Sequence, residues 1–122
     1  WAENNGVEKT VILGATGKRD DHNLANICTL LHFPSTINMK MYSNYGIFSV
    51  VQDQQNFDSF TGQQVSLFSS DPKIEVSSEH LKYNLITKKL TNLYSGSLNE
   101  SLNDSFSVNI SHGRIIVFQL FK

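Results

Sequence analysis

One stretch decides the first part of the fold: residues 10–34 read TVILGATGKRDDHNLANICTLLHFP. Its first four residues are β-branched or apolar and end at Gly14, which is the pattern of a buried strand followed by a tight turn. Apolar side chains then recur at helical spacing over residues 24–31, and either Asp20 or Asp21 can cap the start of that helix. We therefore expect a strand, a glycine turn and a helix, which together form one step of a parallel α/β sheet.

Beyond Pro34 the hydrophobic period changes from helical spacing to two. This alternation predicts short strands at residues 37–41, 47–51, 65–68, 74–76, 81–85, 106–110 and 115–121. Strands spaced by about 8–12 residues are typical of an antiparallel sandwich, and His112-Gly113 predicts a hairpin turn between the last two strands. The predicted fold is mostly β: an antiparallel β-sandwich preceded by a strand–turn–helix remnant of an α/β domain. We place the α/β part at residues 1–34 and the sandwich at residues 35–122.

The composition excludes several classes of protein. The chain has 122 residues, of which 39% are hydrophobic and 17% charged, and its net charge is −1. Such a chain can bury a core, and its near-neutral charge gives no general attraction to nucleic acid or to an anionic membrane. No apolar run approaches the roughly 18 residues of a bilayer span. The only cysteine, Cys28, excludes an internal disulfide framework and a multi-thiolate zinc site.

The sequence favours a cytoplasmic location, because the N-terminus lacks the basic and apolar regions of a signal peptide. Three Asn-x-Ser triplets, which begin at Asn99, Asn103 and Asn109, match the glycosylation pattern. Such triplets arise readily by chance in a chain rich in asparagine and serine.

The glycine turn contains the residue types that bind phosphate. Its small residues let backbone N–H groups approach a ligand, and the start of the helix adds a partial positive charge. Lys18 and Arg19 supply full positive charges, and the guanidinium can hold phosphate oxygens in a fork. Asp21 can bind a metal or accept a proton. The combination suits a nucleotide polyphosphate with Mg²⁺.

Two other interpretations of the turn remain open. It can be a plain strand–helix connection with an aspartate cap and solvated basic side chains, because short glycine motifs are common. A strand followed by Gly-Ala-Thr-Gly also resembles the nucleotide fingerprint of dinucleotide dehydrogenases. That fingerprint requires a third glycine where this chain has Asp20, and it belongs at the start of a long βαβ series.

Longer matches point to one family. Residues 12–26 (ILGATGKRDDHNLAN) closely resemble the central motif of thiamine pyrophosphokinases, which is typically Gly-Gly-Arg-x-Asp-His followed by Leu-x-Asn. Residues 95–100 (SGSLNE) resemble the family's Gly-Thr-Ser-Asn-Glu segment. Residues 81–85 (LKYNL) precede it as Leu-x-Tyr-x-Leu does in the family. The matched frame spans nearly the whole chain, and its first motif is the more specific one.

The resemblance implies an α/β catalytic domain followed by a thiamine-binding β-sandwich, in a homodimer whose active sites are shared between subunits. It implies transfer of a pyrophosphoryl group from ATP, with Mg²⁺, to the thiamine hydroxyl, and release of AMP. The site residues that it implies are Arg19 and Asp21 for catalysis, Asp21 also for the metal, Gly14, Thr16, Gly17, Lys18 and His22 for the ATP phosphates, and Ser97, Asn99 and Phe118 for thiamine. We expect Ser97 and Asn99 in a loop between strands, and a carboxylate such as Glu100 near the thiamine cation.

The chain departs from the family pattern in several places. Lys18 replaces the second glycine of the first motif, and Leu98 stands where the family often has serine. Phe118 is the available aromatic residue on the last strand, where some members carry tryptophan. The family's upstream aspartates, which hold Mg²⁺ and ATP, would lie before Trp1.

These departures bear on what the 122 residues can do alone. We expect these residues alone to be inactive and to bind thiamine weakly or not at all, whereas the full-length parent should both bind thiamine and transfer pyrophosphate. The alternative function is that of a non-catalytic β-sandwich that binds a small ligand or another protein.

Overall fold

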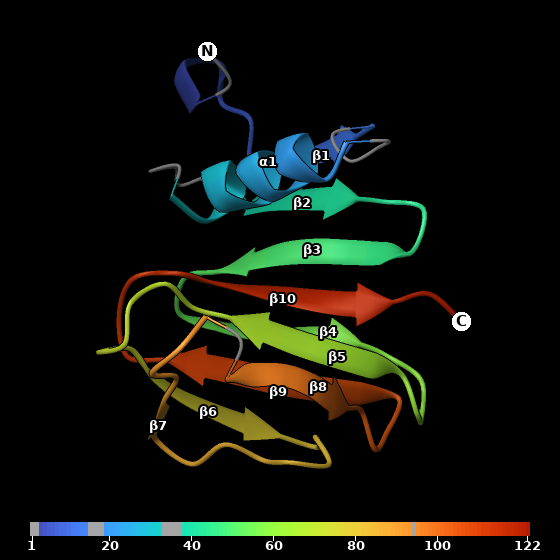
Figure 1. The fold of residues 1–122 in the computed structure, drawn as a ribbon, viewed down its shortest axis with the longest axis vertical. Helices are drawn as coiled ribbons and strands as arrows, with labels where there is room; N and C mark the ends of the chain where they lie inside the picture. Colours follow the sequence, from blue (N-terminus) through green and yellow to red (C-terminus); the bar gives the residue numbers. More distant parts are fainter. Residues whose placement is uncertain (1–2, 15–18, 33–37, 94) are drawn as a thin grey trace.

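A computed structural model describes residues 3–14, 19–32, 38–93 and 95–122 of the chain (Figure 1). Its elements in chain order are η1 (Glu3–Asn5), β1 (Lys9–Leu13), α1 (Asp20–His32), β2 (Asn38–Tyr42), β3 (Gly46–Val51), β4 (Gln54–Asp58), β5 (Gln64–Phe68), β6 (Glu75–Glu79), β7 (Lys88–Lys89), β8 (Gly96–Glu100), β9 (Ser105–Ile110) and β10 (Ile115–Leu120). The predicted class, mostly β with one preceding helix, is confirmed. None of the helices in the described ranges is long and apolar enough to span a bilayer.

The strands form two sheets. A six-stranded sheet has the order β1-β2-β3-β10-β5-β8, and a four-stranded sheet has the order β4-β9-β6-β7. In the larger sheet β1 pairs with β2 in parallel, and the other pairs are antiparallel. Figure 1 shows β1 and α1 at one end of the molecule and the smaller sheet at the other. The predicted boundary between residues 34 and 35 stays a prediction, and strands from both sides of it share the larger sheet.

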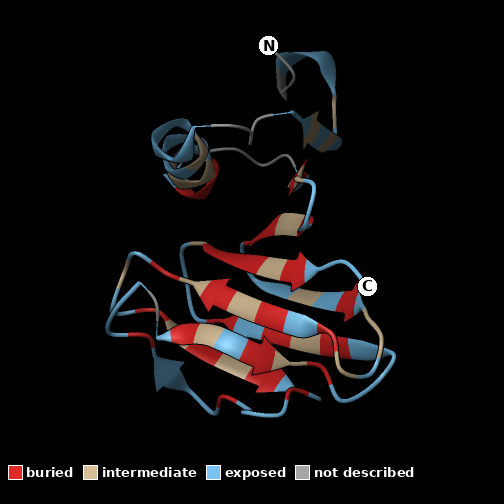
Figure 2. Ribbon diagram, turned by 45° about the vertical axis from the view of Figure 1, so that its right-hand side comes forward, coloured by how far each residue is buried: buried red, intermediate tan, exposed pale blue. Residues whose placement is uncertain are grey.

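The main core lies between the two sheets. Alternate residues of the larger sheet point inward, among them Leu67 and Val117, and meet inward residues of the smaller sheet such as Phe106 and Val108. Figure 2 shows this alternation as buried and less buried residues that succeed one another along the strands. Phe57 and Phe106 stack with their ring centroids 4.9 Å apart. This arrangement follows from the period of two, because successive side chains of a strand point to opposite faces.

Helix α1 covers part of the other face of the larger sheet. Leu30 and Leu31 are its buried residues, and they join a second apolar cluster with Met39, Met41 and Ile116. Asp20 and Asp21 occupy the first turn of α1, where their negative charges interact favourably with the positive end of the helix dipole. In the first turn of the helix, the N–H of Asn23 donates to the carbonyl of Arg19 at 3.1 Å.

Several local predictions are wrong. Residues 112–113 do not close a hairpin, because β9 belongs to the smaller sheet and β10 to the larger one. Residues 81–85 form a turn rather than a strand, with only an isolated bridge from Leu81 to Ser101. Residues 97 and 99 lie in strand β8 and not in a loop. The strand predicted to be buried at residues 10–13 is β1, which lies at the edge of its sheet with Val11 and Leu13 55% and 72% exposed. The sequence patterns also missed β4 and β7.

Candidate functional site

The outer face of the larger sheet, on the side away from the main core, carries an aromatic row. Phe118 of β10 lies opposite Phe48 of β3 on one side and opposite Ser66 of β5 on the other. The rings of Phe48 and Phe118 are tilted by 43° with their centroids 4.6 Å apart. Gly46 gives the ring of Phe118 its space, because a Cβ atom there would lie 2.6 Å from the Cζ of that ring. The predicted thiamine residue Phe118 is thus held by its neighbours in a fixed place.

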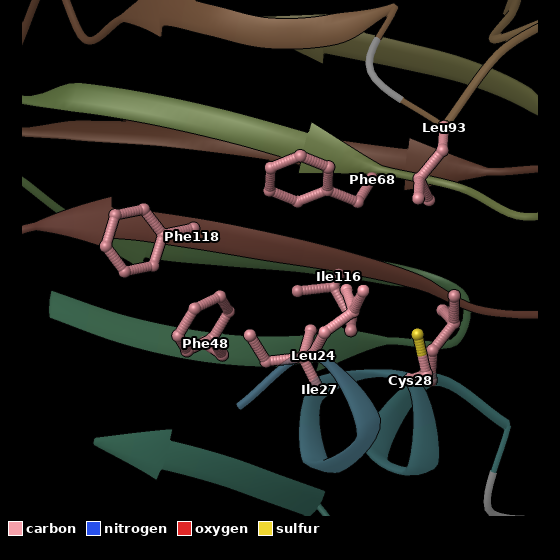
Figure 3. A pocket seen from close by; sticks show the side chains of 9 residues that line it. Leu24, Ile27, Cys28, Phe48, Phe68, Leu93, Ile116 and Phe118 are labelled. Atoms are coloured by element: carbon pink, nitrogen blue, oxygen red, sulfur yellow. The ribbon is translucent and has the colours of Figure 1, made fainter. Parts of the chain in front are cut away.

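An apolar groove of about 340 Å³ lies beside this row, between α1 and the sheet. Figure 3 shows its walls: side chains of the helix face the aromatic rings of the sheet across the groove. The residues that line it are Leu24, Ile27, Cys28, Leu31, Phe48, Phe68, Leu93, Ile116 and Phe118. An apolar, partly aromatic wall suits a flat heteroaromatic ring, because binding removes both surfaces from water.

A β-bulge in β8 borders the aromatic row. Leu67 pairs with Gly96 and Val65 pairs with Asn99, so two residues, Ser97 and Leu98, lie opposite Ser66 alone. Leu98 has a φ of +61°, a left-handed conformation that is unusual for leucine. The residue is also 79% exposed. Its N–H donates to the Oγ of Ser66 at 3.2 Å. Bulges are frequent beside functional sites because they change the direction of a side chain.

Ser97 and Asn99 have different surroundings. Ser97 is half-buried within the bulge, whereas Asn99 is 4% exposed. The carboxamide of Asn99 donates to the carbonyl of Tyr83 at 2.9 Å and accepts from the N–H of Tyr83 at 3.0 Å. It also accepts from the N–H of Glu100 at 2.9 Å. A direct contact of Asn99 with thiamine stays a prediction.

A carboxylate lies on the same outer face. Gln64 is two residues from Ser66 on β5, and it pairs with Glu100 of β8. Residues two apart share a face of a strand. Glu100 and Phe118 therefore lie on the same face, on the two strands that flank β5, and they are offset by two residues along β5. The Oε2 of Glu100 is 3.7 Å from the Nζ of Lys82, which also lies 5.7 Å from the ring centroid of Tyr83. The carboxylate of Glu100 is therefore partly exposed and can attract a cationic ligand.

The predicted phosphate turn is described only at its ends. Thr16, Gly17 and Lys18 lie outside the described residues. Gly14 has a φ of +72°, which favours glycine. The guanidinium of Arg19 donates to both carboxylate oxygens of Asp21, at 3.2 Å from Nε and 2.7 Å from Nη2. Both side chains are more than 60% exposed, and His22 is exposed as well.

The pairing of Arg19 with Asp21 bears on the metal prediction. Within the described ranges, no three histidine, cysteine or acidic side chains form a metal-binding group. Mg²⁺ at phosphate sites takes one or two carboxylates together with phosphate oxygens. Asp21 can contribute one carboxylate, which is too few for a site by itself, so a Mg²⁺ site at Asp21 stays a prediction.

The phosphate turn and the groove are linked by α1. Leu24 lines the groove and lies about one helical turn after Asp20 and Asp21, and a turn rises only about 5.4 Å. The first turn of the helix therefore lies near the end of the groove that Leu24 borders. The sequence prediction named this turn, Phe118 and the β8 segment as site residues. It did not name Phe48 and Ser66, which lie opposite Phe118 on the same face.

Comparisons with known proteins identify the family of the chain. Residues 46–118, more than half of the chain, match the family model described as thiamin pyrophosphokinase, substrate-binding domain. No curated protein sequence matches the chain.

Among solved structures, thiamine pyrophosphokinase from Bacillus subtilis is 20% identical, with a TM-score of 0.83, and the match covers 100% of this chain and 60% of that one. A family protein from Enterococcus faecalis is 18% identical, with a TM-score of 0.80 and coverages of 99% and 59%. Thiamin pyrophosphokinase from Candida albicans is 17% identical, with a TM-score of 0.73 and coverages of 93% and 44%. The chain thus spans three fifths or less of the length of these three proteins. By the family match, it belongs to the thiamin pyrophosphokinase substrate-binding domain family.

Proposed function

We propose that this chain binds thiamine on the outer face of its six-stranded sheet, as part of an enzyme that transfers pyrophosphate from ATP to the thiamine hydroxyl. The family match supports the ligand. The observation that carries the proposal is the aromatic pair of Phe48 and Phe118 at the wall of an apolar groove. An aromatic face attracts a cationic ring, and it also buries the uncharged ring of the same ligand.

Polar groups on this face can orient such a ligand. Ser66 lies next to Phe118, and Ser97 lies opposite Ser66 at the bulge. Hydroxyls such as theirs can donate to or accept from a heteroaromatic ring. Glu100 lies on the other side of β5 from Phe118, and its carboxylate can attract the positively charged thiazolium. The proposed site therefore combines an apolar wall, two hydroxyls and one carboxylate.

The proposed transfer step requires the thiamine hydroxyl to attack the β-phosphorus of ATP in line, with AMP as the leaving group. Charge then develops on phosphate oxygens, and the guanidinium of Arg19 can stabilise that charge. Asp21, which now pairs with Arg19, can hold the guanidinium in place or accept the proton of the hydroxyl. Mg²⁺, when bound, would neutralise phosphate charge.

The neighbouring surfaces are also part of the proposal. Leu24 and Leu93 border the groove and are 59% and 47% exposed, which leaves an apolar rim that a neighbouring subunit can cover. We therefore keep the homodimer with shared sites, the ATP co-substrate and the cytoplasmic location as predictions. The alternative is a binding module without catalysis.

Calorimetric titration of the full-length protein with thiamine tests the ligand. Phe118→Ala should weaken binding by about 1–2 kcal/mol, which is about 5- to 30-fold. Asn44→Ala, an exposed change in the turn before β3, is the control and should bind normally. Equal affinity of wild type and Phe118→Ala would refute the proposed site. An ATP-dependent assay on the same protein separates the enzyme from the binding module, because only the enzyme forms AMP and thiamine diphosphate.

A further inference from the structure

Asn99 is the buried polar residue of strand β8, and its side chain bonds to the backbone of Tyr83 and Glu100. Its Oδ1 accepts the N–H groups of Tyr83 and Glu100, and its Nδ2 donates to the carbonyl of Tyr83. A carboxamide oxygen has two lone pairs, so both are in use. The side chain is also only 4% exposed, which leaves little surface for a ligand.

The segment that Asn99 holds runs along β8, the last strand in the order of its sheet. Leu81 forms a bridge with Ser101, and the N–H of Lys82 donates to the carbonyl of Glu100 at 2.8 Å. Asn84 closes the turn by accepting the N–H of Leu81 at 3.0 Å. At Tyr83, the bonds to Asn99 attach the turn to the strand.

This attachment fixes two side chains beside the bulge. Tyr83 is 61% exposed, and Lys82 reaches Glu100 and the ring of Tyr83. If the bonds of Asn99 were absent, the backbone of Tyr83 would lose a donor and an acceptor partner, and the turn could leave the strand. The position of Lys82, and with it the charge around Glu100, would then change.

We propose that Asn99 is a positioning residue: it acts on thiamine through the turn at residues 81–84 and not by contact. This inference rests on the proposed function, because the turn borders the proposed thiamine face. It also accounts for the two distant sequence motifs, residues 81–85 and 95–100, being joined by one side chain.

The first test is hydrogen exchange in the full-length protein without ligand. Asn99→Ala should speed the exchange of the Tyr83 amide, because that amide loses its acceptor. Asn103→Ala is the matched control: Asn103 is an exposed asparagine close to Asn99 in sequence, with a side chain that pairs with His80, and it should leave the exchange of Tyr83 unchanged. Unchanged exchange of Tyr83 in Asn99→Ala would overturn the proposal, whether or not the protein binds thiamine.

The second test compares two ligands by calorimetry: thiamine and an analogue whose pyrimidine lacks the amino group. Positioning predicts that Asn99→Ala weakens both by the same factor, about tenfold for the loss of a buried hydrogen-bonding group. It also predicts a smaller loss in a Lys82→Ala background, because the turn acts on the charge around Glu100 through the side chain of Lys82. A loss confined to thiamine, with unchanged affinity for the analogue, would make Asn99 a direct contact and overturn the proposal.

Two further controls keep the outcomes distinct. If Asn99→Ala does not fold, Asn99→Asp replaces it: this variant keeps the acceptor for both N–H groups and loses the donor to the Tyr83 carbonyl. It should weaken both ligands equally, and a loss for thiamine alone would again overturn the proposal. Failure of the wild-type protein to bind thiamine would refute the proposed function, and the exchange of Tyr83 would then still decide the role of Asn99.

Discussion

Replacement of Gly46 by alanine should affect both stability and thiamine binding. A Cβ atom at this position would lie 2.2 Å from the carbonyl oxygen of Gln119 and 2.6 Å from the Cζ of Phe118. Ordinary non-bonded contacts between heavy atoms are about 3.5–4.0 Å, so β10 must shift by about 1 Å. The φ of Gly46 is not positive, and alanine can adopt this backbone conformation. The effect therefore comes from crowding alone.

The magnitude follows from the atoms that must move. The ring of Phe118 can turn, but the carbonyl of Gln119 is backbone in a strand that pairs on both sides. Overpacking of this kind costs about 1–3 kcal/mol, which for a domain of this size lowers Tm by roughly 4–15 °C. Because the ring of Phe118 moves, thiamine should also bind more weakly, by about fivefold or more.

The assays are calorimetric melting and thiamine titration of the full-length protein. Asn44→Ala is the control in the neighbouring turn, and it should stay within about 0.5 kcal/mol of wild type. A melting temperature of Gly46→Ala equal to that of the control would refute the close packing of β3 against β10. A lower melting temperature with normal affinity would show that thiamine does not use the ring of Phe118.

Three other substitutions test the rest of the account. Arg19→Ala should raise the activation free energy by about 2–4 kcal/mol in steady-state kinetics of the full-length enzyme without changing Tm, because its ion pair is exposed; wild-type turnover would remove Arg19 from the site. Asp21→Asn should also keep Tm and lose activity, whereas a lower Tm with normal specific activity would leave Asp21 only a role in stabilising the helix. Phe106→Ala should lose about 3–5 kcal/mol in denaturant unfolding, because Phe106 is 1% exposed and stacks on Phe57; a loss below about 1 kcal/mol would contradict this core.

The sequence predicted those elements whose signals are local and strong. β1 and α1 are marked by a β-branched run, a glycine and helical spacing, and β10 by a long apolar run. β4 was missed because its sequence, QQNFD, has one inward apolar residue, Phe57. Residues 81–85 were predicted as a strand because Leu81, Tyr83 and Leu85 alternate with polar residues. In the structure Leu81 and Leu85 are buried in a turn that hydrogen bonds hold.

Non-local features were beyond the sequence patterns. A glycine after a strand indicates a turn, but it does not tell whether the next strand joins the same sheet. The predicted hairpin at residues 112–113 was wrong because β9 and β10 belong to different sheets. Phe118 was a candidate from its place on the last strand. Its neighbours Phe48 and Ser66 are about 70 and 50 residues away and meet it only through the register of three strands, which no local pattern encodes.

The most direct measurement is NMR of the full-length protein with labelled phenylalanine rings, titrated with thiamine. The account predicts saturable shifts of the ring signals of Phe48 and Phe118, which line the groove, and nearly unchanged signals from Phe57 and Phe106, which lie between the sheets. Unchanged signals from Phe48 and Phe118 at saturating thiamine would contradict the claim that thiamine binds on the outer face of the six-stranded sheet.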